Sequence, residues 1–406
     1  TDEPRGGEIS GTGITRASQY GYDDRAGIYT RTGPDGQTTT VQTDLAGRVF
    51  TTARDTLVAL YDYYANGQVQ SVTYNNGTLV SYEYDDAERL TAIRHQNLNN
   101  QTEPVILELT YGYNARGLIT SIGETAPGQA STVTTFAYDK RGRLIVERRI
   151  GSHEGGLRYY YDQGGNRKLN IDHVNGATTS YHYDTDTELV DCDGDGDADT
   201  APKDCYHTRH NRLMYYETLG ATIREKVWYQ YDLTSAAAGN PTYIVRQVYN
   251  AGNPFAPPVN YGYVLNYNSS GELWFISKQT WTGHDCPPEA QVTQSIHEFR
   301  TSGRAMRLTR ERDPQFPNVA LAGTTQWHDF DGDEAYADSS VSVAPQGGPV
   351  TLTALHAREP GIGMKDVQTG DTSYFHGDQI GSLRAVTDTP AGTASVTGRV
   401  VYTAFG

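Results

Sequence analysis

β-Branched and aromatic side chains recur at every second position in the segment that precedes a repeated turn. In residues 132–138, Thr134, Phe136 and Tyr138 alternate with Val133, Thr135 and Ala137. β-Branched and aromatic residues at this period are typical of a pleated strand. A polar segment with a glycine follows at 139–142, and residues 143–146 resume an extended, half-buried run. The pattern therefore predicts a strand, a turn and a second strand.

The turn in this unit has the sequence Tyr-Asp-Lys-Arg-Gly-Arg-Leu. Its aspartate can accept hydrogen bonds from backbone N–H groups two residues further on, and its glycine can adopt the positive φ that closes a short hairpin. Both properties belong to turn geometry. We therefore predict a structural role in the repeat turn, and no catalytic role, for Tyr138, Asp139, Gly142, Arg143 and Leu144.

Variants of this turn recur along most of the sequence. Copies or near-copies start about 20 to 29 residues apart, at Tyr22, Thr43, Tyr63, Tyr84, Tyr113, Tyr138, Tyr161 and Tyr183, and looser copies follow. Units of this length cannot bury a core alone, so neighbouring copies must pair edge to edge. The sequence predicts an all-β fold of many β-hairpins, with one short helix over residues 352–358.

Composition and charge narrow the class of protein further. The chain has 30 Tyr but only 9 Phe, and its mean hydropathy is −0.61, so amphipathic aromatic side chains must supply much of the buried surface. A net charge of −16 with no basic cluster would repel a nucleic-acid backbone. No apolar run approaches the roughly 20 residues of a membrane helix. We therefore predict neither a nucleic-acid partner nor a membrane span.

An acidic insertion, at about residues 184–206, interrupts the repeats after Tyr183. Its aspartates alternate with other residues and would repel one another unless a hard cation gathered them. Counted from Asp191, the segment follows the register of an EF-hand calcium loop, except that position 12 is Pro202 instead of Glu. The predicted ligands of a structural Ca²⁺ are Asp191, Asp193, Asp195, Asp197 and Asp199, with Asp204 in place of the missing glutamate. The alternative is a solvated acidic loop without metal.

Two cysteines flank the same segment. A disulfide between Cys192 and Cys205 would brace the loop, and a closed loop of this size predicts about 3 kcal/mol of stabilisation. This disulfide would leave Cys286 as a single thiol, and the cysteine pattern indicates an oxidising compartment. The alternative is a pair of free thiols.

The sequence lacks the common catalytic motifs. There is no Gly-x-Ser-x-Gly elbow, phosphate-binding loop, His-Glu-x-x-His pair or dinucleotide-binding glycine motif. We therefore predict that the chain is not an enzyme. An acid pair assembled across the sheet, as in glycosidases, is the alternative.

The repeated Tyr-Asp-x-x-Gly-Arg-Leu motif resembles the YD repeat of the Rhs family, which also occurs in teneurins. A second signature runs from Tyr374 through His376, Asp378 and Ser382, followed by Tyr-Thr-Ala-Phe-Gly at 402–406. It resembles the start of the Rhs-associated core domain. The resemblance implies a spiralling sheet that forms a hollow, barrel-like or cocoon-like shell over residues 1–365, with the start of the core region at 366–406.

The resemblance also implies a function. Bacterial relatives are secreted polymorphic toxin proteins whose shell encapsulates a C-terminal toxin. The implied partners are the rest of the same chain or further copies of it. The alternative is an extracellular structural or adhesive protein of the cell surface that binds glycans or surface proteins. In this chain, Asp313-Pro314 lacks the glycine context of the autoprotease motif that many of these relatives carry. Such a motif after Gly406, followed by a variable domain, would favour the toxin shell.

Overall fold

The structure is a computed structural model. It describes residues 5–8, 15–33, 37–102, 104–151, 154–183, 211–221, 224–231, 239–250, 253, 256–267, 273–282, 292–302, 306–312, 325–331, 334–343, 350–359, 361–388 and 394–400. Across these residues the regular elements are all β-strands, so the predicted all-β fold is confirmed.

The strands are short and follow one another closely. Their bounds are β1 (Arg5–Glu8), β2 (Thr15–Asp23), β3 (Ile28–Thr32), β4 (Thr38–Thr43), β5 (Val49–Arg54), β6 (Leu57–Tyr63), β7 (Val69–Tyr74), β8 (Thr78–Tyr84), β9 (Leu90–Asn97), β10 (Val105–Tyr113), β11 (Ile119–Thr125), β12 (Thr132–Tyr138), β13 (Leu144–Ile150), β14 (Gly155–Tyr161), β15 (Arg167–Asp172), β16 (Thr178–Tyr183), β17 (Leu213–Leu219), β18 (Arg224–Tyr231), β19 (Pro241–Tyr249), β20 (Val259–Tyr267), β21 (Leu273–Thr282), β22 (Val292–Ser302), β23 (Met306–Arg312), β24 (Thr325–Asp331), β25 (Glu334–Val343), β26 (Val350–Glu359), β27 (Gly363–Asp366), β28 (Thr372–Gly377), β29 (Leu383–Asp388) and β30 (Val396–Arg399).

Each strand pairs antiparallel with the next one along the chain, from β1 to β30. The sheet is therefore one long meander built from local hairpins. The pairing of β27 with β28 continues it past residue 366, where the second signature was predicted to start its own region. Both predicted regions share this one sheet.

A β-bulge precedes the motif tyrosine in repeat after repeat. The register shifts at Asp62/Tyr63, Glu83/Tyr84, Gly112/Tyr113, Ala137/Tyr138, Tyr160/Tyr161 and His182/Tyr183. A bulge bends its strand and increases the local twist. Bulges at the same position in successive hairpins therefore curve the whole sheet in one direction.

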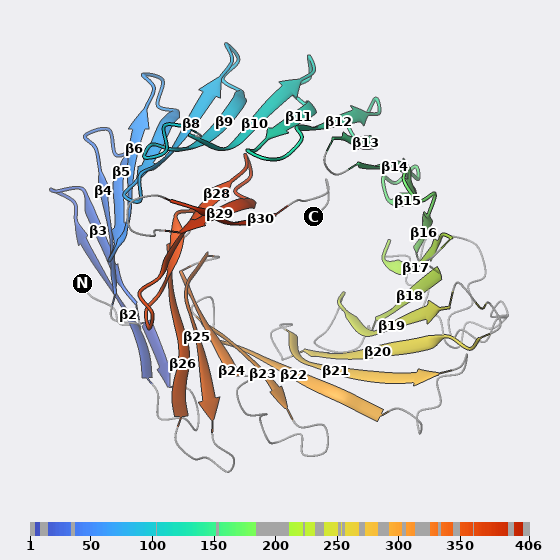
Figure 1. The fold of residues 1–406 in the computed structure, drawn as a ribbon. Helices are drawn as coiled ribbons and strands as arrows, with labels where there is room; N and C mark the ends of the chain where they lie inside the picture. Colours follow the sequence, from blue (N-terminus) through green and yellow to red (C-terminus); the bar gives the residue numbers. More distant parts are fainter. Residues whose placement is uncertain are drawn as a thin grey trace.

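The curved sheet comes back onto itself. Figure 1 shows the last strands, β28, β29 and β30, on the concave side of the sheet beside strands from its first part. Side chains join the two layers: the Tyr374 hydroxyl donates to Asn75 Oδ1 over 2.5 Å, and Lys365 pairs with Asp55. We call β27 to β30 the docking layer. The predicted spiral is confirmed by this overlap.

The hydrophobic core lies in the overlap. Its buried members are Leu57, Ala59, Val72, Tyr74, Val80, Ile93, Ile106, Leu107, Leu109, Tyr111 and Ala126 from the first layer, together with Ile362 in the turn before β27 and Tyr374 of β28. The two layers thus bury together the aliphatic faces that neither could bury alone.

One local prediction is wrong. Residues 352–358, predicted as a short helix, lie inside β26, whose Ala357 pairs with Ala337 of β25 and with Lys365 of β27. The same strand begins with Val350, Thr351 and Thr353, whose β-branched side chains suit a strand. Pairing on both sides decides the outcome, because tertiary context overrides weak helix propensity.

Candidate functional site

Each repeat turn is built around its aspartate, and the turn after β12 is representative. Asp139 Oδ1 accepts hydrogen bonds from the backbone N–H groups of Arg141 (2.8 Å) and Arg143 (2.9 Å). Asp139 Oδ2 pairs with Arg143 Nε at 2.7 Å. Gly142 has a φ of 85°, which a glycine adopts without steric cost, and its N–H donates to the Asp139 carbonyl. Leu144 then pairs with Tyr138 at the start of β13.

These contacts keep the turn aspartates ionised. The backbone hydrogen bond from Arg143, and then the Arg143 side chain, lower the pKa of Asp139 below its ordinary value. Arg48 lowers the pKa of Asp44 in the same order, and Arg89 lowers that of Asp85 through its side chain first. A carboxylate held in this way serves as a hydrogen-bond acceptor, which is a structural task.

The motif tyrosine connects each repeat to the one before it. The Tyr161 hydroxyl donates to the Leu144 carbonyl over 2.6 Å, while the Arg143 guanidinium lies 4.7 Å from the centre of the Tyr161 ring. The hydroxyls of Tyr63, Tyr84, Tyr113, Tyr138, Tyr183, Tyr231 and Tyr267 make the same bond to an upstream carbonyl. The sequence reasoning missed this link, although the motif arginine of one turn and the motif tyrosine of the next recur along the chain.

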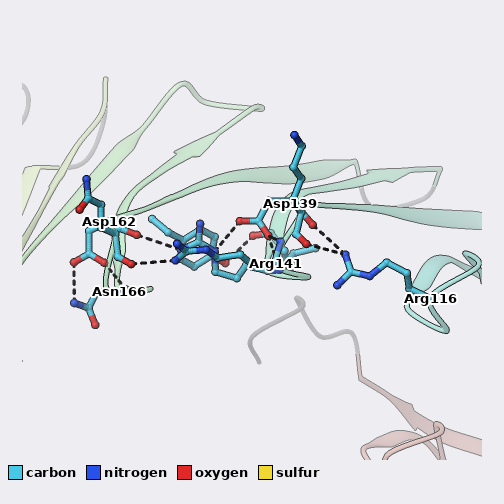
Figure 2. Close-up of polar contacts among 10 residues, drawn as sticks. Arg116, Asp139, Arg141, Asp162 and Asn166 are labelled. Carbon is cyan, nitrogen blue, oxygen red and sulfur yellow. Dashed lines mark hydrogen bonds and ion pairs between the residues drawn. The ribbon is translucent and has the colours of Figure 1, made fainter.

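Arginines also join successive turns along one rim of the sheet. Figure 2 shows Arg116 reaching the turn at Asp139, and Arg141 reaching towards the turn at Asp162. Arg116 Nη1 donates to the Lys140 carbonyl at 3.3 Å, and Arg141 Nη1 donates to the Gln163 carbonyl at 3.0 Å. Together with the tyrosine bonds they form a continuous set of contacts, which we call the turn ladder.

The concave face changes character beyond the overlap. Residues opposite each other in an antiparallel ladder lie on the same face of the sheet, as do alternate residues along one strand. Leu109 is opposite Glu124, and Glu124 is opposite Thr132. The pairings from β12 to β18 continue the same face to Tyr181, Tyr216 and Glu225. Over β16 to β19 it presents aromatic rings and an ion pair. The Tyr181 and Tyr216 rings lie 5.9 Å apart.

The ion pair on this face is well formed. Glu225 Oε2 accepts from Arg246 Nη2 at 2.6 Å and from Arg246 Nε at 2.8 Å, and Glu225 Oε1 accepts from the Tyr216 hydroxyl at 3.3 Å. Burial, and then the Glu225 charge, raise the pKa of Tyr216 to about 12. The phenol therefore remains a neutral donor, and the face is polar and aromatic instead of aliphatic.

The second sequence signature lies in the docking layer. Asp378 Oδ1 accepts from the backbone N–H groups of Ile380 (3.1 Å) and Ser382 (2.9 Å), so this segment forms another repeat-like turn. The Arg384 guanidinium pairs with Glu124 of β11 across the two layers. His376 contacts His95 of β9. The signature residues thus attach the end of the sheet to its beginning.

The predicted calcium and disulfide residues lie outside the described residues. Asp191, Asp193, Asp195, Asp197, Asp199, Asp204, Cys192 and Cys205 all fall between Tyr183 and Leu213. Those two residues pair with each other in β16 and β17, so the acidic segment connects two neighbouring strands. Within the described part of the chain, no group of three or more His, Cys, Asp or Glu side chains is arranged to hold a metal ion.

No helix long and apolar enough to cross a membrane occurs in the described residues.

Comparison with known proteins places the fold. The RHS Repeat family model matches residues 63–96, which contain the turns at Tyr63 and Tyr84. The chain is similar to a solved structure named "Crystal Structure of TcdB2-TccC3-Cdc42", with 15% identity and a TM-score of 0.52 over 94% of this chain and 18% of that one. It also matches "Crystal Structure of TcdB2-TccC3" at 15% identity, covering 95% of this chain and 23% of that chain, with a TM-score of 0.38. A search among curated proteins finds no match.

Proposed function

We propose that this chain is part of an Rhs-repeat protein and that its spiral sheet forms part of the wall of a secreted bacterial shell that encloses a polypeptide cargo. The chain spans less than a fifth of the length of the solved chain with which it shares its fold. The cargo we propose is a toxin or effector segment of the same polypeptide, located outside the repeats. The wall itself has no catalytic task in this proposal.

The observation that carries the proposal is the contrast across the concave face. Where the docking layer covers that face, the residues are buried and many of them are aliphatic, as at Leu109 (0% exposed). Along β16 to β19 the same face carries Tyr181, Tyr216 and the Glu225–Arg246 pair. A tyrosine lining offers both ring surface and hydroxyl groups without demanding one partner shape. Such a lining suits contact with a polypeptide of varied sequence.

Support also comes from the way in which the wall is made. The turn ladder fixes curvature through contacts between neighbouring repeats, so the wall needs no filled interior to keep its shape. The similar solved structure is named for TcdB2, TccC3 and Cdc42 together, so the matching fold there belongs to an assembly. We infer that the present chain likewise works together with further parts of its own polypeptide or with partner subunits.

We propose that the acidic segment binds a structural calcium ion. Its carboxylates would provide the oxygen ligands that this cation prefers. The disulfide between Cys192 and Cys205 would brace the same connection in the oxidising environment of a secreted protein.

Protease protection of the full natural protein tests enclosure. The intact protein is digested with a broad-specificity protease at neutral pH, and the resistant peptides are identified by mass spectrometry. We expect a resistant segment outside the repeats, which becomes sensitive once urea has unfolded the wall. If every segment outside the repeats is cut in the folded protein, enclosure is wrong. Binding of the intact protein to glycans or surface proteins would then support the structural or adhesive alternative.

A further inference from the structure

Two histidines meet where the docking layer lies on the first layer. His95 belongs to β9 and His376 to β28, and their side chains come together with the residues 2% and 0% exposed. The two Nδ1 atoms are 3.0 Å apart. The ring planes are nearly perpendicular, at 87°, with centroids 4.8 Å apart. The turn ladder does not involve this contact, and it joins residues that are 281 positions apart in the sequence.

The neighbours of the pair determine where each ring carries its proton. His95 Nε2 lies 3.1 Å from the Gly377 carbonyl, which can only accept, so His95 Nε2 carries the hydrogen. His95 Nδ1 is then an acceptor, and His376 Nδ1 must donate to it. His376 Nε2 consequently accepts from the Thr387 hydroxyl at 3.0 Å. Asn76 Nδ2 lies 3.4 Å from that hydroxyl oxygen and completes the chain of hydrogen bonds.

With the donors assigned in this way, both rings are neutral. A proton added to His95 Nδ1 would place an N–H group against the N–H of His376, with no acceptor between them. A proton added to His376 Nε2 would face a hydroxyl that now donates to that atom. Either proton would also place a positive charge in a buried contact, which is costly without a paired anion.

The charged and titratable groups around the pair do not compensate for such a charge. Arg399 of β30 opposes a positive charge on His376. The carboxylates of Asp378 and Glu124 both pair with the Arg384 guanidinium, Asp378 at 3.6 Å. From the first layer, the Tyr74 ring packs edge-on against His376 at 6.5 Å between centroids. Burial raises the pKa of Tyr74, so its phenol is neutral.

We propose that the His95–His376 pair is an acid-sensitive latch: it holds the docking layer on the first layer at neutral pH and releases it on acidification. The inference rests on the contact between the two layers and holds whatever the shell encloses. If the shell has the proposed cargo, the latch would make the overlap the place where the wall opens in an acidic environment.

The direction of the pH dependence follows from the pKa values. Burial lowers the pKa of His95 to about 4, and burial followed by the His95 and Arg399 charges lowers that of His376 to about 3. Exposed histidine titrates near 6.5. The released state therefore binds more protons, so docking is fully favoured above about pH 6.5 and weakens as pH falls towards 4. Within that window each histidine weakens docking by up to about tenfold per pH unit.

Hydrogen exchange of the backbone amides tests the latch in the wild-type chain. Rates in β28 and β29, corrected for the intrinsic effect of pH, are compared between pH 7.5 and pH 4.5 with rates in β14 as an internal reference. We expect exchange in the docking layer to rise by about tenfold or more on acidification, while β14 changes far less. A docking layer whose protection is the same at both pH values would overturn the proposal.

Variants identify the groups responsible. The double variant His95→Gln with His376→Gln should lose most of the pH dependence of hydrogen exchange in the docking layer. The control variant is His173→Gln, which replaces an exposed histidine in the turn after β15 and should retain that pH dependence. Unchanged pH dependence in the double variant would contradict the latch. If the double variant does not fold, NMR titration of the wild-type imidazoles decides. Two resonances that titrate well below pH 6 support the latch, and titration of all of them near 6.5 refutes it.

Discussion

Strands β6 to β11 and strands β12 to β19 carry the same turn motif, but they are stabilised in different ways. In the first region the docking layer covers the concave face and a cluster of aliphatic side chains is buried, with Leu57, Ile93 and Leu109 at most 1% exposed. Among the described residues, β12 to β19 contribute no member to that cluster. We call the second region the arc. Its neighbouring strands are joined by the turn ladder and by polar contacts on the concave face.

The difference separates two tasks that a repeat can perform. The motif sets local geometry, since its bulge, its aspartate and its tyrosine bond are the same in both regions. It does not set the location of the core, because among the residues whose burial is described the core cluster forms where distant parts of the spiral come into contact. Shape is therefore encoded in every repeat, whereas hydrophobic stability is concentrated at the overlap.

The largest effect is expected from shortening a core side chain in the overlap. Leu109→Ala removes buried aliphatic contacts at a fully covered site and should lower the free energy of unfolding by about 2 to 5 kcal/mol. The matched variant Leu219→Ala lies in the arc, where the side chain is 44% exposed, and should change stability by about 0.5 kcal/mol or less. Thermal and urea unfolding measure both. Equal losses would show that the arc is packed as tightly as the overlap.

An effect of intermediate size is expected from removing calcium. Excess chelator should lower stability by about 2 to 3 kcal/mol if the ion is normally present at about 100 times its dissociation constant. The loss should appear as faster hydrogen exchange in β16 and β17, which flank the acidic segment, with β9 and β28 unaffected. Calcium should restore the original rates, and an Asp193→Asn, Asp195→Asn variant should not respond. An unchanged melt, with no calcium found by elemental analysis, would contradict the metal site.

The smallest effect is expected from removing one hydroxyl of the turn ladder. Tyr161→Phe in the arc deletes the 2.6 Å bond to Leu144, and Tyr84→Phe in the overlap deletes the 3.1 Å bond to Val69. Each should cost about 1 kcal/mol, the net value of an ordinary hydrogen bond. Because the ladder has the same role in both regions, the two losses should agree within about 0.5 kcal/mol. A clear difference between them would show that the ladder depends on the layer packed against it.

Much of the fold could be predicted from the sequence because its determinants are local. The alternation through Thr134, Phe136 and Tyr138 predicts β12, and the chemistry of Asp139 and Gly142 predicts the turn after it. The repeat then predicts antiparallel neighbours. The wrong helix over 352–358 shows the limit of local reasoning, since the ladders on both sides of β26 determine its conformation.

The contacts between layers could not be predicted in the same way. His95 and His376 carry no pattern that relates one to the other, and their contact depends on how far the sheet curves over many repeats. The same is true of the pair between Arg384 and Glu124. The stacking of Arg143 on Tyr161 was also missed, but it joins adjacent repeats, and both residues belong to the recurring motif. A contact between adjacent repeats can therefore be traced to the motif, whereas a contact between layers depends on the accumulated curvature of the sheet.

Zero-length cross-linking tests the self-overlapping spiral most directly. Lys365 of the docking layer contacts the Asp55 carboxylate in the turn between β5 and β6, so a carbodiimide should join them in an amide bond. Mass spectrometry of the digested monomer is predicted to find this cross-link within one chain, and Lys365→Arg is predicted to abolish it. If the monomer lacks the cross-link, or if it forms only between two chains, the sheet does not return onto its own beginning and the account is wrong.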